Sequence, residues 1–161
     1  MTTISTTTLP LAAGTWTADP PHTTVGFVVR HLGLSKVRGR FDGVTAQLVV
    51  GDDLASSSVS AVIEMGTVKT GNADRDAHLA SSDFFNAETN PTMTFRSTSI
   101  AGEGEEYTLV GDLTINGVTK QVELDVEFFG TSVAPMDQSI RAGFSATGTI
   151  SRKDFGIDFN A

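Results

Sequence analysis

The chain has 161 residues, enough for one domain with a substantial core. It contains no cysteine, which excludes disulfide frameworks, thiol catalysis and metal sites built on thiolates. With 11 Lys and Arg against 19 Asp and Glu the formal net charge is −8, and this charge disfavours nucleic acid and anionic membrane surfaces as partners.

The N-terminal residues 1–13 are rich in threonine and predict a tail, followed by a single domain over residues 14–161. The first residues include neither a basic residue nor the apolar run of a signal peptide. No segment reaches the roughly 18 apolar residues that a membrane-spanning helix needs. The sequence as written therefore predicts a cytoplasmic protein without stable membrane insertion.

Alternation of apolar and polar residues predicts β-strands along most of the chain, each with one apolar face. The clearest run is 118–128, in which only Lys120 interrupts the apolar face. A last alternating strand is expected from Phe155, Ile157 and Phe159. The other predicted strands lie near residues 25–31, 44–50, 59–65, 92–96, 108–115 and 140–150.

Turn and helix signals separate these strands. Asn116-Gly117 predicts a two-residue hairpin of type I′, and polar hairpin loops are expected at residues 51–53 and 102–106. Residues 72–88 break the alternation and offer Asn72 or Asp74 as a helix N-cap, so one or two short helices are expected there.

Antiparallel strands with one apolar face each bury those faces together in a sandwich or a closed barrel. An eight-stranded barrel has an interior that is filled by side chains or holds one small ligand. Small residues on the apolar faces suit a cavity, but they also suit a packed core, in which small and large side chains interdigitate. These small residues are Ala46, Ala61, Ala142, Ala146 and Gly148.

Motifs for catalysis or metal binding are weak. The chain has no phosphate-binding loop, no HExxH and no GxSxG. His31 ends an apolar strand face, which fits a buried structural histidine or a ligand contact. His22 lies in the loop before that strand and His78 in the predicted helix, and the spacing of the three histidines matches no metal motif.

Several motifs in order resemble the YceI-like family of lipocalin-like barrels that bind polyisoprenoids. The resemblance runs from about Gly14 to Phe159. It is carried by Trp16-Thr-Ala-Asp-Pro-Pro-His22, His31-Leu-Gly-Leu-Ser35, Asp74-Arg-Asp-Ala-His78-Leu79, Ser82-Asp-Phe-Phe85, Asn90-Pro-Thr-Met-Thr-Phe95, Gly111-Asp-Leu-Thr-Ile-Asn-Gly117 and Arg152-Lys-Asp-Phe-Gly156.

The resemblance implies an all-β fold, an elongated antiparallel barrel of about eight strands with short helices near residues 72–88. It also implies an apolar lumen that holds a long isoprenoid chain, no catalysis, no metal and no cofactor besides that lipid. Members of the family often form homodimers and are often periplasmic or secreted. The expected function is non-enzymatic carriage or sequestration of a polyprenyl or quinone-like lipid.

On this hypothesis the apolar strand faces line the lumen, and His31 and His78 are the polar groups nearest its mouth. One alternative is an enzyme acting on an apolar substrate through His22, His31 and His78. Another is a structural barrel that binds a protein partner at an open edge. The expected lumen residues are Phe27, Val29, Val44, Leu48, Ile63, Phe95, Leu113, Val122, Leu124, Phe128, Phe144 and Ala146.

Overall fold

The computed structural model describes residues 11–19, 23–31, 35–81 and 85–155, apart from the side chains of residues 30, 31, 35 and 153. The ten strands among these residues are β1 Gly14–Thr17, β2 Val25–His31, β3 Ser35–Phe41, β4 Val44–Val50, β5 Ser58–Glu64, β6 Val68–Lys69, β7 Thr92–Glu103, β8 Glu106–Ile115, β9 Val118–Val133 and β10 Ile140–Thr147. One α-helix, α1, covers Ala73–Ala80, and short 3-10 helices lie at Leu54–Ser56 (η2), Met65–Thr67 (η3) and Arg152–Phe155 (η4).

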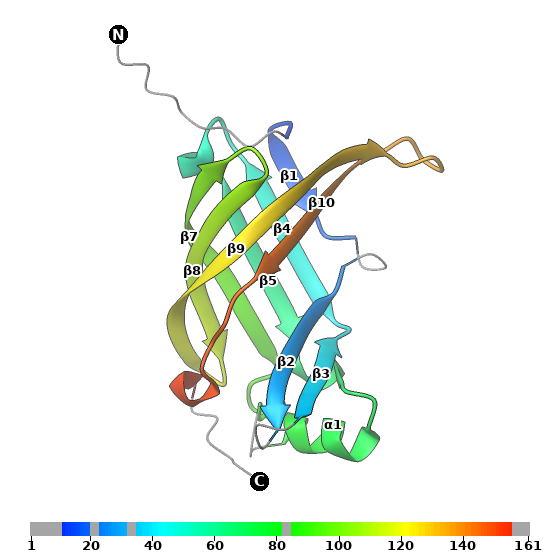
Figure 1. Ribbon diagram of the computed structural model, residues 1–161, viewed down its shortest axis with the longest axis vertical. Helices are drawn as coiled ribbons and strands as arrows, with labels where there is room; N and C mark the ends of the chain where they lie inside the picture. Colours follow the sequence, from blue (N-terminus) through cyan, green and yellow to red (C-terminus); the bar gives the residue numbers. More distant parts are fainter. Residues whose placement is uncertain (1–10, 20–22, 32–34, 82–84, 156–161) are drawn as a thin grey trace.

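Seven strands form one antiparallel sheet in the order β1-β4-β5-β7-β8-β9-β10, which curves into a half-barrel (Figure 1). The strands β2, β3 and β6 form a second, smaller sheet beside it. The predicted all-β antiparallel fold of lipocalin type is thus confirmed. Its strands are divided between two sheets: β1 pairs with β4 in the larger sheet, whereas β3 pairs with β2 on one side and β6 on the other in the smaller sheet.

The predicted turn and helix signals have clear counterparts. Asn116 and Gly117 have φ values of 55° and 74°, as a type I′ turn requires, and they join β8 to β9. The Asn72 side chain accepts a hydrogen bond from the backbone N–H of Arg75 and caps α1. The expected hairpin loop at 51–53 instead leads into η2, where Asp53 and Ser56 form a capping box.

Several strands differ from the sequence prediction: β7 runs to Glu103 instead of residue 96, β10 ends at Thr147 instead of residue 150, and β1, β3 and β6 were not predicted. Strand β9 continues to Val133 because a bulge between β9 and β10 brings Phe128 opposite Phe144 and Gly130 opposite Gly143. Phe155 was expected in a final strand, and this is wrong: it lies in η4, where it is only 1% exposed. The rest of that expected strand lies outside the described residues.

The buried apolar side chains form two clusters. The helix-end cluster contains Phe41, Ile63, Met65, Val68, Ile115 and Phe155, with Leu79 of α1 packed against it. The loop-end cluster contains Val50, Tyr107 and Phe128, with Trp16 and Leu54 among the partly buried residues around it. The two clusters pack the structure on either side of a middle section.

The ends of two phenylalanine rings lie against glycines of neighbouring strands. A Cβ atom on Gly39 would come within 2.3 Å of the ring of Phe27, and one on Gly111 within 2.4 Å of the ring of Phe95. Because glycine has no side chain, each ring rests directly on the neighbouring backbone.

Tyr107 is the only tyrosine of the chain, and it closes the β7–β8 hairpin from inside. It is 5% exposed, and its hydroxyl donates a hydrogen bond of 3.0 Å to the carbonyl of Gly104. Burial, and secondly the negative charge of Glu103, raise the pKa of Tyr107.

We expect the phenol of Tyr107 to ionise at a higher pH in the folded protein than in the unfolded chain. Because the folded pKa is raised, Tyr107 stabilises the fold below the unfolded pKa, and this contribution is lost as the pH rises through the folded pKa. Absorbance at 295 nm during an alkaline titration measures it, with the chain in denaturant as the reference. Identical midpoints in the two titrations would contradict the prediction.

Candidate functional site

The candidate site is the concave inner face of the half-barrel. Strands β9 and β10 pass in front of β4 and β5, and β7 and β8 connect these two walls (Figure 1). Apolar residues meet across the strands on this face. The cross-strand partners include Ala46 and Ala61, Phe95 and Leu113, Leu109 and Leu124, Val126 and Ala146, and Phe128 and Phe144.

Most of the expected lumen residues are packed in the two clusters. Phe27, Val44, Ile63, Leu113 and Val122 belong to the helix-end cluster or pack against it. Phe128 belongs to the loop-end cluster and Leu48 packs against it, and Phe95 is 7% exposed. Both ends of the inner face are therefore filled by protein side chains.

Four of the expected lumen residues are less covered. Phe144 is 40% exposed although its ring centroid lies 5.0 Å from that of the buried Phe128. Ala146, on the same side of β10, is exposed although its partner Val126 packs at the loop end, and Leu124 on β9 is half-buried. Val29 lies on the same side of β2 as the packed Phe27 and is 46% exposed. Apolar surface is thus left exposed on β10 beside the loop-end cluster and on β2.

A polar link joins β10 to the segment after β1. The guanidinium of Arg141 bonds the carboxylate of Asp19, 122 positions earlier in the chain. It also lies 3.5 Å from a carboxylate oxygen of Asp137, and its Nε donates to the Ser139 hydroxyl at 3.1 Å. The hydroxyl and backbone N–H of Ser139 hold the pKa of Asp137 below its usual value. This link connects the last strand of the seven-stranded sheet to the segment that follows its first strand.

The histidines do not form a site among the described atoms. His78 lies on α1 with an exposed side chain, and the backbone of His31 pairs with Ser35 at the end of β2. His22 and the side chain of His31 lie outside the described part of the chain. Within that part, no three or more acidic or histidine side chains gather as metal ligands would.

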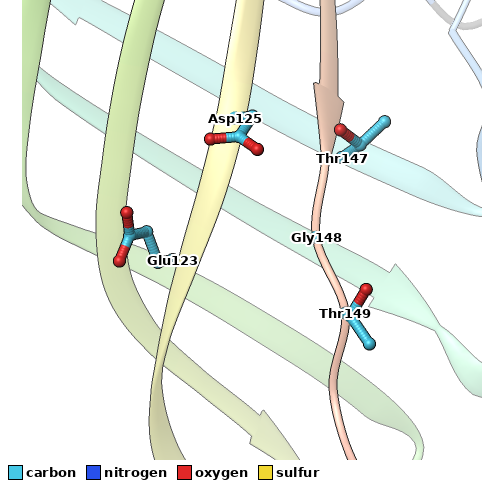
Figure 2. A pocket seen from close by; sticks show the side chains of 5 residues that line it. All are labelled: Glu123, Asp125, Thr147, Gly148 and Thr149. Carbon is cyan, nitrogen blue, oxygen red and sulfur yellow. The ribbon is translucent and has the colours of Figure 1, made fainter.

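The pocket in Figure 2 lies on the opposite, polar side of the β9–β10 pair. It has a volume of about 280 Å³ and is lined by Glu123, Asp125, Thr147, Gly148 and Thr149. A wider hollow of about 680 Å³ adjoins it, towards Gly102, Glu106 and Ser145. Carboxylates and hydroxyls dominate both linings, so neither suits an apolar ligand.

Sequence reasoning did not include three residues of the inner face that lie near the middle or the loop end. Leu109 is 5% exposed on β8, Tyr107 is buried on the same strand, and Val126 packs at the loop end. All three lie on the same side of their strands as the residues that were expected in the lumen. The alternation along each strand could therefore have identified them.

The fold and this face define a class of protein: a lipocalin-like half-barrel whose inner surface is apolar and partly uncovered. A family model described as a YceI-like domain matches residues 16–161. The chain belongs to the YceI-like family.

Relatives and solved structures support this assignment. A UPF0312 protein of Staphylococcus epidermidis is 43% identical over 144 residues, which cover 88% of this chain and 81% of the relative. The YceI protein of Campylobacter jejuni superimposes with a TM-score of 0.69 at 36% identity, over 88% of this chain and 83% of the other. BcnA of Burkholderia cenocepacia superimposes with a TM-score of 0.75 at 25% identity, over 85% and 82% of the two chains.

Proposed function

We propose that the protein binds a long apolar lipid of isoprenoid type along the inner face of the half-barrel and carries or sequesters it without chemical change. The observation that carries this proposal is the exposed apolar surface at Phe144 and Ala146 on the inner face of β10 and at Val29 on β2. Soluble proteins seldom leave apolar side chains exposed on a concave face unless a ligand covers them.

The chemistry of the face suits an isoprenoid. Of the twelve aromatic residues of the chain, ten are phenylalanines, so the aromatic surface has few polar groups. An isoprenoid tail needs only shape and apolar area, because burial contributes about 0.8 kcal/mol per methylene-sized unit. A binding role, rather than a catalytic one, therefore needs no residue beyond those on the inner face.

The polar link of Arg141, Asp19 and Asp137 lies where β10 meets the segment after β1. In the proposed function it closes one side of the half-barrel over the bound lipid. The family resemblance adds the expectation of a homodimer, which light scattering of the purified protein measures directly.

The proposal predicts a co-purifying lipid. Organic extraction of protein purified without detergent, followed by mass spectrometry, should yield a polyprenyl or quinone-like species at near-stoichiometric amount. A long isoprenoid at a hundredfold excess over its dissociation constant should stabilise the fold by about 2.7 kcal/mol. No extracted lipid and no shift of the melting temperature with any isoprenoid would contradict the proposal.

A further inference from the structure

The β9–β10 hairpin extends beyond the body of the half-barrel as a two-stranded arm (Figure 1). We define the arm as residues 129–143. Its four large apolar side chains are Phe129, Val133, Met136 and Ile140, which are 63%, 61%, 98% and 58% exposed. This concentration of exposed apolar side chains on a protruding element requires a physical reason.

The apolar side chains cover more than one side of the arm. Val133 and Ile140 are cross-strand partners on the face that continues into Phe144 and the interior. Phe129 lies on the opposite face, because a Cβ atom on Gly143 would contact its side chain at 3.5 Å. Met136 occupies the turn itself. A single flat protein surface could cover one of these faces only, whereas lipid surrounds an inserted element on all sides.

Charge and backbone bonding of the tip also fit an apolar medium. Residues 128–136 contain no charged side chain although the whole chain carries −8. Two backbone N–H groups are bonded within the turn: Ala134 N–H donates to the Ser139 carbonyl at 2.8 Å, and Gln138 N–H to the Ala134 carbonyl at 2.9 Å. The arm carries two charged side chains, Asp137 in the turn next to Met136 and Arg141 on β10, and they lie 3.5 Å apart as an ion pair. These backbone groups keep their hydrogen bonds, and the two charges keep each other as partners, when the tip enters a lipid surface.

We propose that this arm is a membrane-contact element, which dips reversibly into the surface of an uncharged, zwitterionic bilayer. The net charge of −8 repels anionic bilayers, so the contact relies on apolar burial at the tip. Four side chains give far less area than the roughly 800 Å² per partner of a standard protein interface, which disfavours a second copy as the occupant. No helix in the described part of the chain is long and apolar enough to cross a bilayer.

The arm also gives the interior a path to the membrane. Val133, Ile140 and Phe144 share one face that runs from the tip of the arm to the inner surface, with the pair Thr131 and Ala142 between them. An apolar lipid moving along this face would meet apolar side chains except at Thr131. This last step rests on the proposed function, whereas the contact itself does not.

The absence of cysteine allows one fluorophore to be attached at a chosen position. A polarity-sensitive label on Met136→Cys should shift to shorter wavelength and brighten with phosphatidylcholine vesicles. The same label on Val28→Cys, a position 51% exposed on β2, should not respond. Added phosphatidylglycerol should weaken the response. No response at position 136, or an equal response at both positions, would overturn the proposal.

Vesicle flotation tests whether the apolar side chains of the arm cause the membrane contact. Val133→Asp and Met136→Asp should each lower partitioning into phosphatidylcholine vesicles at least about tenfold, because each replaces an apolar side chain that the bilayer would bury by a charged one. Val28→Asp, a matched exposed valine outside the arm, should change it less than about twofold. Arm-dependent dimers in light scattering, without vesicle binding, would overturn the membrane assignment.

Lipid extraction separates this inference from the proposed function. Met136→Asp should retain the co-purifying lipid of the unmodified protein but deliver it to acceptor vesicles at least about tenfold more slowly. Vesicle binding by a protein that contains no lipid would leave the arm contact standing and contradict the proposed function. Normal lipid content without vesicle binding would contradict the arm contact and leave the proposed function standing.

Discussion

Replacing Phe155 by alanine should lower the free energy of unfolding by about 3–5 kcal/mol. The ring is 1% exposed in η4 and packs in the helix-end cluster with Phe41, Ile63 and Ile115. Removing it leaves a cavity in a close-packed cluster, and the surrounding side chains can collapse into it only partly. The midpoint of urea unfolding, at an unchanged dependence on urea concentration, measures the effect.

Phe129→Ala is the matched control for this substitution. It removes the same side chain from a position 63% exposed on the arm, and it should change the free energy of unfolding by no more than about 0.5 kcal/mol. Equal losses for Phe155→Ala and Phe129→Ala would show that η4 does not close the helix end of the core.

Replacing Ala146 by leucine should weaken binding of a long isoprenoid at least about tenfold while leaving the lipid-free protein as stable as before. Ala146 is exposed on the inner face of β10 opposite Val126, so the larger side chain enters uncovered space instead of a packed core. It then occupies volume that the lipid tail would fill. Titration of the lipid by intrinsic fluorescence of Trp16, with a parallel unfolding curve, measures both quantities.

The neighbouring residue provides the control. Ser145 lies on the outer face of the same strand, and Ser145→Leu adds a similar side chain to the surface facing away from the interior. It should leave binding unchanged. A loss of about 1–3 kcal/mol in stability for Ala146→Leu, with normal binding, would mean that Ala146 faces packed protein.

The sequence was sufficient for those parts of the local structure that neighbouring residues determine. Alternation along residues 118–128 predicted which side of β9 faces inward, and Asn116-Gly117 predicted its turn. The cap at Asn72 depends on a bond to the backbone three residues later, so it also could be read from the sequence. The resemblance in motifs predicted the lipocalin-like fold and the family.

Features that depend on distant contacts were not predictable in the same way. Alternation at Phe155, Ile157 and Phe159 fits a strand, but burial of Phe155 against β3 and β5 residues requires a 3-10 turn instead. Alternation also cannot show where one extra residue, as at Phe129, allows a strand to continue into an arm.

The candidate site also has features that neighbouring residues determine and features that depend on distant contacts. Parity predicted which side of each strand faces inward, but it could not separate packed Ile63 from uncovered Phe144. That difference depends on which side chains from other strands, and from η4, reach each position. Of the predicted polar groups, the exposed His78 lies on α1, while the position of the His31 side chain is outside the described atoms.

The rings that lie on glycine have a consequence for how sequences of this fold can diverge. At Gly111 an added methyl group would meet the ring of Phe95 at 2.4 Å and the backbone carbonyl of Arg96 at 2.6 Å. At Gly39 the three nearest atoms all belong to the Phe27 ring. A larger residue at position 39 therefore becomes acceptable once position 27 shrinks, whereas position 111 stays closed whatever replaces Phe95. Among related chains, positions 27 and 39 should change together, and position 111 should change very little.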